Sequence, residues 1–448
     1  MACPGPDTAS AHGFVDPAGS LMRILLGYQE IAGYYGRLCQ GLHELGVEAD
    51  FIALQSHRFA YAESAAAASA SGQDRLLSYV IRLRFRDGQL SKRQLLRKLT
   101  VRLLYILLAF LLLLRWCRRY DAFVLGFHSH LLFFWELPLL KLLGKRIIYI
   151  YHGSDSRPVY LDGNFAGKLG GAELATAAAL QRRTIHRIES YADFIVNNPA
   201  QGHFFTRPFV AFLQLGIPFQ PQTKPAAPAA DKPGVRVLHC PSNPEVKGSE
   251  QIRRVIRSLQ TRGFMIDWVE LIDRPNSEVM AELVRCDLIV DQLYSDTPMA
   301  GFATEAAFFG KPAVVAGYYQ DHALDFSPDP APPSYYCLPD ELEQTLVHVL
   351  ESPAEREEMG RKAQAFVTGH WSAARVAGRL LRMLESGAPP EWYFDPGRLR
   401  YLHGSGLPEE QLCKALGQLL AAAGPAGLQL DDKPALRQAF LDLVARSC

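Results

Sequence analysis

A proline-rich segment divides the chain into two parts of similar character. The stretch "PFQPQTKPAAPAADKPG", residues 218–234, contains five prolines. Proline has no backbone N–H and fixes φ, so this composition favours an extended spacer over a packed helix or strand. We therefore expect residues 218–234 to link two domains. The length of 448 residues also favours two domains over one.

The part before the linker alternates short apolar runs with helical patterns. Residues 21–28, "LMRILLGY", are typical of a buried parallel strand, and Leu38, Leu42 and Leu45 then share one face of a helix. Further strands are expected at residues 47–54, 121–128, 145–155 and 193–198. This alternation predicts a doubly wound α/β domain over residues 21–217.

The part after the linker repeats the alternation. Strands are expected at residues 235–242, 265–272, 287–294 and 311–317, with helices between them. We therefore expect a second α/β domain over residues 235–388. From residue 389 to residue 448 the pattern becomes helical, which indicates a small helical extension. Residues 1–20 lack the basic and apolar regions of a secretory signal, and we expect a disordered tail there.

The composition excludes several classes of protein. Hydrophobic residues make up 48% and charged residues 21%, the balance of a soluble globular protein, and the net charge of +1 does not point to a nucleic-acid partner. The eight cysteines are scattered without a C-x-x-C pair, so we expect neither a zinc site nor a disulfide framework. Together with the absence of a secretory signal, this favours a cytoplasmic location.

A leucine-rich stretch framed by cations raises the question of a membrane. Residues 103–114, "LLYILLAFLLLL", are twelve uninterrupted apolar residues, and a bilayer core needs about 20 residues of helix. Arg82 to Arg119 include eleven Lys or Arg against a single Asp. Three interpretations stay open: a buried domain helix, a helix on the anionic inner face of a membrane, and a span.

Lys247 follows the first strand of the expected second domain. In "HCPSNPEVKGSEQI", residues 239–252, a strand ends in a polar turn, and Ser249 can cap the helix that follows. Ligands of open α/β sheets lie beyond the carboxyl ends of the strands, where helix N-termini offer N–H groups to phosphate. Lys247 could hold a diphosphate there. The alternative is a solvated lysine in a turn.

Glu305 lies in a second candidate motif, "GFATEAAFFGKPAVV", residues 301–315. Gly301 would let the backbone approach a ligand, and Glu305 lies about one turn into the expected helix. A carboxylate can accept hydrogen bonds from two adjacent hydroxyls such as those of ribose, while the N–H groups of residues 300–302 face the attached phosphates. The alternative is a glutamate that is stabilised by the helix dipole in the first turn and has no role in binding.

The two motifs together resemble the nucleotide-sugar half of group-1 type glycosyltransferases with the GT-B fold. The resemblance covers about residues 21–385. It implies an α/β protein in which two Rossmann-like, doubly wound domains face each other across a cleft. It also implies transfer of a sugar, with retention, from a nucleoside diphosphate donor to a glycan or lipid-linked acceptor. Glu305 would bind the donor ribose and Lys247 the diphosphate, and no metal or other cofactor would be needed.

The resemblance also implies the remaining site residues. The catalytic group is His152, Lys247 and Glu305. The donor side comprises Ser242, Asn243, Lys247, Gly248, Thr297, Ala300, Gly301, Phe302 and Glu305. The acceptor side draws on "GYQEIAGYYGRL" and "YHGSDSRP", which supply Gly33, Gly36, Asp155 and Arg157, and on "FHSH", which supplies His128. If that last stretch is extended, His128 and His130 share one face.

Two departures from the family pattern leave other functions open. Thr297 stands where the family commonly has the first of two glutamates, and Ser242 stands where it has a basic residue. A second hypothesis is therefore a catalytically silent GT-B protein that binds nucleotide or glycan, or that supports a partner enzyme. A third is another enzyme of the same fold, such as a sugar-nucleotide epimerase.

Overall fold

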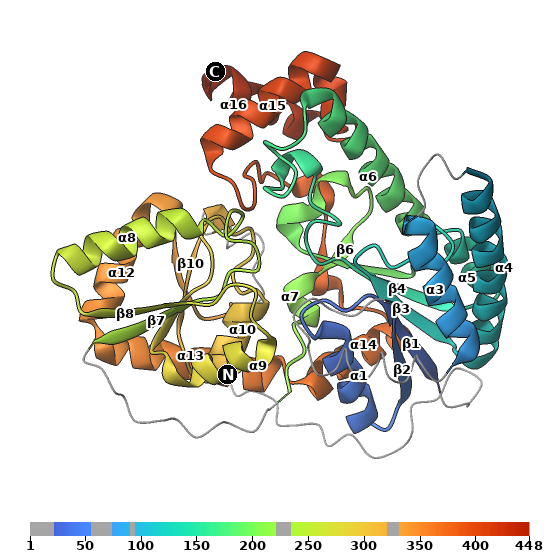
Figure 1. Ribbon diagram of the computed structural model, residues 1–448, viewed down its shortest axis with the longest axis horizontal. Helices are drawn as coiled ribbons and strands as arrows, with labels where there is room; N and C mark the ends of the chain where they lie inside the picture. The colour runs from blue at the N-terminus through green and yellow to red at the C-terminus, as the bar shows by residue number, and fades with distance from the viewer. Residues whose placement is uncertain (1–21, 55–73, 90–94, 221–233, 320–330, 448) are drawn as a thin grey trace.

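The computed structural model describes residues 22–54, 74–89, 95–220, 234–319 and 331–447. Within these residues the chain forms two lobes, each built around its own β-sheet (Figure 1). The tail expected at residues 1–20 and most of the expected linker, residues 221–233, lie outside the described residues.

The first lobe contains a seven-stranded sheet in the order β12-β6-β5-β4-β3-β1-β2. Its strands are β1 (Arg23–Tyr28), β2 (Glu48–Ala53), β3 (Ala122–Gly126), β4 (Arg146–Ile150), β5 (Phe194–Asn197), β6 (Phe209–Ala211) and β12 (Tyr393–Phe394). All neighbours pair in parallel except β6 and β12. Helices cover both faces, which explains why β3, and β1 and β4 after their first residues Arg23 and Arg146, are buried along their whole length.

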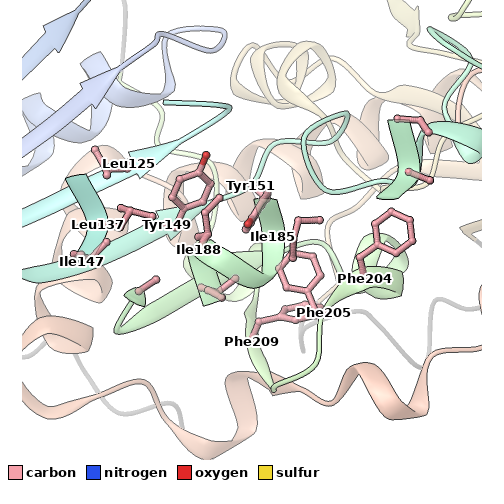
Figure 2. Close-up of a cluster of buried hydrophobic side chains, with 14 of the residues drawn as sticks. Leu125, Leu137, Ile147, Tyr149, Tyr151, Ile185, Ile188, Phe204, Phe205 and Phe209 are labelled. Atoms are coloured by element: carbon pink, nitrogen blue, oxygen red, sulfur yellow. The ribbon is translucent and has the colours of Figure 1, made fainter. Parts of the chain in front are cut away.

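The helices of the first lobe that precede the second lobe in the chain surround this sheet (Figure 1). They are α1 (Tyr34–Glu44), α3 (Arg75–Gln89), α4 (Leu95–Arg119), α5 (Glu136–Leu142), α6 (Gly171–Tyr191) and α7 (Phe212–Leu215). Short 3₁₀ turns lie at Val159–Leu161 and Pro199–Phe204. Figure 2 shows part of the core, where Tyr149 and Tyr151 pack with Phe205 and with Ile185 and Ile188 of α6.

The second lobe contains a five-stranded parallel sheet in the order β11-β10-β9-β7-β8. Its strands are β7 (Val235–His239), β8 (Ile266–Glu270), β9 (Leu288–Val290), β10 (Ala313–Ala316) and β11 (Tyr335–Cys337). Its helices are α8 (Ser249–Thr261), α9 (Asn276–Arg285), α10 (Gly301–Phe308), α12 (Leu342–Glu351) and α13 (Pro353–His370). The α/β alternation predicted on each side of the linker is therefore present.

The chain crosses between the lobes at two neighbouring points. The first crossing leaves the first lobe at Phe219, and the second returns to it after α13, at Trp371. The N–H of Phe219 donates to the Trp371 carbonyl at 2.9 Å, and the N–H of Ala373 donates to the Phe219 carbonyl at 2.8 Å. The two lobes are thus joined by a double strand of chain, which restricts their relative movement more than one linker would.

The return crossing gives the C-terminal residues to the first lobe. α14 (Ala373–Ser386) packs on α1 so closely that a Cβ on Gly41 would lie 2.2 Å from the Ala373 carbonyl oxygen. β12 is an edge strand of the first sheet, and α15 (Glu409–Ala423) packs on α6, with α16 (Pro434–Ser447) beside it (Figure 1). The domain boundary expected at residue 388 therefore needs correction, because α14 and the helical extension both complete the first lobe.

Candidate functional site

A cavity of about 300 Å³ lies between the two lobes. The first lobe contributes Ile31 and Ala32, from the loop after β1. The second lobe contributes the loops that follow β7, β8 and β9 and the start of α10. Loops that follow parallel strands meet at one edge of a sheet, where α/β proteins bind their ligands. The cavity therefore lies where the sequence motifs predict a ligand.

Lys247 lies in the turn between β7 and α8, at the wall of this cavity. Its Nζ donates to Gln292 Oε1 at 2.5 Å and lies 3.6 Å from Asp291 Oδ1. Both partners directly follow β9, so the ammonium is held in place by the neighbouring strand. The alternative of a solvated lysine in a turn does not describe this arrangement.

The residues after Lys247 shape the turn. Gly248 has φ +70° and is the N-cap of α8, and a Cβ there would lie 2.7 Å from Leu293 Cβ. Ser249, expected to cap this helix, instead places its hydroxyl 2.8 Å from Nε2 of buried His239. Burial lowers the pKa of His239, so this imidazole is neutral. The expected serine cap is thus corrected: Ser249 anchors a buried histidine.

Glu305 is buried in α10 and reaches across the cleft. Its Oε1 accepts hydrogen bonds from Arg37 Nη2 at 3.1 Å and from Asn276 Nδ2 at 3.3 Å. Arg37 belongs to α1 of the first lobe, and its guanidinium lies 5.0 Å from the ring centroid of Phe219. The carboxylate therefore has a cationic partner on the opposite lobe, which an interpretation through the helix dipole alone does not explain.

The start of α10 faces the same cavity. Ala300, Gly301 and Phe302 all line it. A Cβ on Gly301 would lie 3.7 Å from Ala32 Cβ, so the first-lobe loop lies directly against the helix start. The first N–H groups of a helix have no acceptor within the helix, and they carry partial positive charge. The backbone thus offers donors to an anion beside Lys247.

A second cavity, of about 150 Å³, adjoins the first and shares Ile31, Ala32, Ala300 and Gly301 with it. Its other walls are mixed. They include the aromatic side chains of Tyr34, Tyr151, His152 and Phe212 and the polar side chains of Arg37, Asn198, Gln201 and Thr297. The Nε2 of His152 lies 3.0 Å from the Tyr35 hydroxyl. Burial lowers the pKa of His152 to about 3, so the imidazole is neutral near pH 7.

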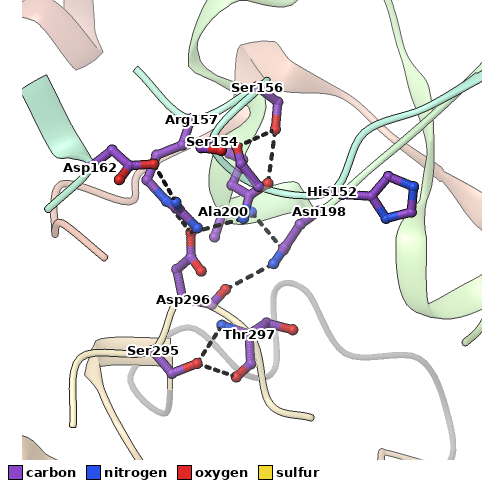
Figure 3. A network of polar contacts seen from close by, with 12 residues as sticks. His152, Ser154, Ser156, Arg157, Asp162, Asn198, Ala200, Ser295, Asp296 and Thr297 are labelled. Carbon is purple, nitrogen blue, oxygen red and sulfur yellow. Dashed lines mark hydrogen bonds and ion pairs between the residues drawn. The ribbon is translucent and has the colours of Figure 1, made fainter. Parts of the chain in front are cut away.

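A second buried ion pair crosses the cleft beside Thr297 (Figure 3). Arg157 Nε donates to Asp296 Oδ2 at 2.7 Å, and Arg157 Nη1 donates to Asp162 Oδ2 at 2.8 Å. Asp296 also accepts from Gln201 Nε2 at 2.9 Å. Burial alone would lower the pKa of Arg157, but the two carboxylates outweigh it and raise that pKa. Arg157 therefore joins the lobes and is not an open acceptor contact.

Asp155 shapes the loop that carries His152. Its Oδ1 accepts from the N–H groups of His152 and Gly153, at 2.9 Å each. Burial raises the pKa of Asp155. The role expected for Asp155 on the acceptor side is thus indirect, through the backbone next to His152.

The structure brings some of the expected residues together and separates others. Lys247, Ser242, Ala300, Gly301, Phe302 and Glu305 line the larger cavity, and His152 and Thr297 line the smaller one. Within the described part of the chain, Gly33, Gly36, Asn243 and Gly248 line neither cavity. Gly33, with φ +78°, is the N-cap of α1, and Asn243 donates to Asn164 of the first lobe at 3.3 Å.

His128 lies apart from the cleft cavities and corrects a further expectation. Phe127 and His128 have φ of +46° and +56°, because the chain turns sharply after β3. His128 and His130 are therefore not on one face of a strand. Both instead line a small pocket with Arg84 of α3.

Two functional candidates escaped the sequence analysis. Arg37 is one residue beyond Gly36 in the motif, and only its partner Glu305 marks it as a cleft residue. Glu30 accepts from the N–H groups of Tyr35 and Gly36, at 3.0 Å each. The chain's own carboxylate thus fills the α1 N-terminus, where the glycine loop was expected to open towards a ligand. Among the described residues, no cluster of three or more His, Cys, Asp or Glu could hold a metal ion.

Two Rossmann-like lobes face each other, and loops from both enclose one cavity beyond the carboxyl ends of their strands. This arrangement of two lobes across a cleft is the one that the resemblance to GT-B proteins predicts. It places Lys247 and Glu305 on one lobe and Arg37 and His152 on the other.

The comparisons with known proteins give distant likenesses. No protein-family model and no curated protein matches the chain. Sucrose-phosphate synthase from Thermosynechococcus elongatus is 15% identical over 81% of this chain and 99% of that chain, with a TM-score of 0.47. The glycosyltransferase SnogD from Streptomyces nogalater is 14% identical over 81% and 99%, with a TM-score of 0.41. Anabaena HepE, solved with UDP and glucose, is 12% identical over 81% and 99%, with a TM-score of 0.44.

Proposed function

We propose that this protein transfers a sugar, with retention, from a nucleoside diphosphate sugar to a glycan or lipid-linked acceptor. The observation that carries the proposal is the convergence of Lys247, the start of α10 and Glu305 on one cavity between the lobes. A cation, a row of backbone N–H donors and an acceptor carboxylate match a diphosphate joined to a ribose.

The diphosphate would lie between Lys247 and the start of α10. Lys247 Nζ would then exchange its hydrogen bond with Gln292 for one to a phosphate oxygen, while Asp291 keeps the ammonium oriented. The ribose hydroxyls would donate to Glu305, which shares its Oε1 with Arg37 in the structure. The smaller cavity, lined by aromatic and polar side chains that include the neutral His152, would take the transferred sugar.

The reaction needs stabilisation of the charge that grows on the departing diphosphate. The bond between the sugar C1 and the phosphate oxygen breaks, the acceptor oxygen bonds to C1, and the acceptor proton passes to the departing phosphate. Lys247 and the N–H groups of α10 supply fixed positive charge at that point, which is the largest contribution in many active sites. We infer that a metal ion is not required, because these groups already oppose the charge.

One observation favours the catalytically silent alternative. Asp296 is the carboxylate nearest in sequence to Thr297, and it is engaged by Arg157 and Gln201. It therefore contacts the opposite lobe, and Thr297 offers only a hydroxyl to a sugar. On this reading the protein would bind a nucleotide or glycan without turnover.

The experiment that distinguishes these functions combines two measurements. The first is the thermal unfolding of the protein with UDP, GDP, ADP, CDP and dTDP, since a ligand at 100 times its dissociation constant adds about 2.7 kcal/mol of stability. The second is nucleotide release from the matching sugar donors, with and without EDTA and a pool of glycan and lipid-linked acceptors. Stabilisation with acceptor-dependent, EDTA-resistant release supports transfer. Stabilisation with an unchanged donor supports the silent protein, and conversion of the donor into another nucleotide sugar without release supports an epimerase. Release without acceptor supports a hydrolase, and no stabilisation refutes the donor site.

A further inference from the structure

Helix α4 has two apolar faces, and only one of them is buried. Tyr105, Ala109, Leu112, Leu113 and Trp116 pack into the core of the first lobe. On the opposite side, the spacing of three and four residues places one row of side chains along the helix. This row, named here the α4 outer face, consists of Leu96, Leu99, Leu103, Leu107 and Phe110. Their side chains are between 40% and 83% exposed.

One exposed aromatic side chain adjoins α4. Phe133, in the loop before α5, is 37% exposed. Its ring lies 6.3 Å from that of Tyr105 in α4, and the Arg102 guanidinium lies 4.9 Å from its centroid. Trp135 of the same loop is 65% exposed, and its ring lies 4.6 Å from the Arg187 guanidinium of α6.

The charge around the α4 outer face has one sign. Residues 95–119 contain six Lys or Arg and no Asp or Glu. Arg115 and Arg119, at the end of the helix, pair with Asp74 and Asp50. The first half of the helix contains the other cations except Arg118, and there Arg97 and Arg102 flank the exposed leucines.

These observations favour one occupant of the surface over others. A second copy of the chain would bring the same cations against each other, which disfavours a symmetric dimer. Residues Leu96–Arg119 are long and apolar enough to cross a membrane, yet 33% of the most apolar 18-residue window in this helix is buried inside the lobe. A crossing helix would have to expose the core side chains that it covers. An anionic bilayer surface satisfies both the leucines and the arginines without unfolding the lobe.

We propose that the α4 outer face docks this protein onto an anionic membrane surface, with α4 lying in the plane of the lipid headgroups. Figure 1 shows α4 at the outer edge of the first lobe, on the side away from the second lobe, so docking leaves the cleft open. Arg84 of α3 also donates to the His130 carbonyl at 2.7 Å, beyond the carboxyl end of β3. The helix pair thus reaches the sheet edge that carries the acceptor-side loops. Under the proposed transfer reaction, on which this step rests, the position of the helix pair at a membrane suits a lipid-linked acceptor.

The test is co-sedimentation of the full chain with vesicles of phosphatidylcholine, alone or mixed with phosphatidylglycerol, at low and high salt. The wild-type protein is expected to bind the anionic vesicles and to be released by salt. Arg97→Gln with Arg102→Gln should weaken binding about 25-fold, at about fivefold for each cation. Leu103→Gln with Leu107→Gln should weaken it by a similar factor or more.

Matched controls lie on the second lobe. Met265→Gln changes an exposed apolar side chain there, and Arg254→Gln with Lys362→Gln removes two exposed cations. Both should bind vesicles like the wild type. The proposal fails if the wild type stays in the supernatant, or if controls and α4 variants bind equally. It also fails if the protein dimerises without lipid and Leu103→Gln with Leu107→Gln abolishes the dimer. Vesicle binding is measured without nucleotide. A failure to bind vesicles therefore does not bear on the proposed donor site, and a failure to bind nucleotide does not bear on the proposed membrane docking.

Discussion

Arg37 and Glu305 form a buried ion pair between the two lobes, with Nη2 of the arginine 3.1 Å from Oε1 of the glutamate. The two side chains are only 4% and 5% exposed. Arg37 comes from the helix after β1, and Glu305 comes from the helix after β9. A ligand whose hydroxyls bind Glu305 must therefore share the carboxylate with Arg37 or displace it. Under the proposed function, the pair would link donor binding to the contact between the lobes.

Breaking this pair from one side should destabilise the protein strongly. Arg37→Leu or Glu305→Leu leaves one buried charge without its partner, which costs about 3 to 5 kcal/mol in comparable buried pairs. The double variant Arg37→Leu/Glu305→Leu removes both charges and should lose far less than the sum. Urea unfolding of the wild type, the two single variants and the double variant gives the four free energies of unfolding. The exposed pair of Arg254 and Glu250 in α8 provides the control, and its cycle should show no measurable coupling. Additive losses at Arg37 and Glu305 would contradict the buried pair.

Lys247→Ala should weaken binding of a nucleoside diphosphate much more than binding of the nucleoside alone. A charge pair at 4 Å is worth about 4 kcal/mol at an effective dielectric of 20 before desolvation is subtracted. Because desolvation removes part of this energy, we expect a loss of about 10- to 100-fold for the diphosphate. Isothermal titration of both ligands measures this difference. Lys362→Ala, an exposed lysine of α13, should change neither affinity. An equal loss of affinity for the nucleoside diphosphate and the nucleoside would mean that Lys247 does not contact the phosphates.

Gly248→Ala should destabilise the protein more than Gly263→Ala, although both glycines have positive φ. At Gly263 a Cβ would meet no atom within 4 Å, so the variant should cost only the left-handed conformation, about 1 kcal/mol. At Gly248 the new Cβ would lie 2.7 Å from Leu293 Cβ, which adds overpacking of about 1 to 3 kcal/mol. Chemical denaturation gives the two values. If both variants lose the same stability, the close approach of the Lys247 turn to Leu293 is wrong.

The pH dependence of stability should report the buried neutral state of His152. Its pKa is about 3 in the folded protein against 6.5 for an unperturbed histidine. Between these values the unfolded state binds more protons, so the contribution is complete above pH 6.5 and is lost as the pH falls towards 3. His203, also buried with a pKa of about 3, should contribute in the same direction.

The variant His152→Gln isolates this contribution. Wild type should lose about 2 to 3 kcal/mol more than the variant between pH 7 and pH 4.5, as measured by urea unfolding at each pH. Identical pH profiles would mean that His152 is already charged, or already solvated, in the folded protein.

The sequence predicted the parts of the fold that local patterns encode. The apolar runs around Leu25, Val124 and Ile289 gave strands in the expected order, and the prolines after Phe219 marked the first crossing between the lobes. It did not predict that the chain returns at Trp371, because the contact of α14 with α1 joins residues more than three hundred positions apart. Nothing within the α14 sequence itself specifies which lobe it covers.

The candidate site shows the same division. Lys247, Gly301 and Glu305 follow strands or open helices, so their meeting at one sheet edge could be anticipated. Arg37 and Asp296 could not, because each is defined by a partner from the other lobe. The conformation of His128 was also out of reach, since two successive non-glycine residues with positive φ depend on the packing around β3.

The most direct test of the donor site uses the ribose hydroxyls as the probe. The best-binding nucleoside diphosphate and its 2′-deoxy analogue are titrated by calorimetry into wild type and into Arg37→Leu/Glu305→Leu, which removes the carboxylate without leaving a lone charge. We expect wild type to bind the ribose form about tenfold more tightly, because the lost hydroxyl leaves Glu305 short of a donor, and we expect the double variant to bind both forms alike. Equal preference for the ribose form in the two proteins, or no binding of any nucleoside diphosphate to wild type, would contradict a donor site at Glu305.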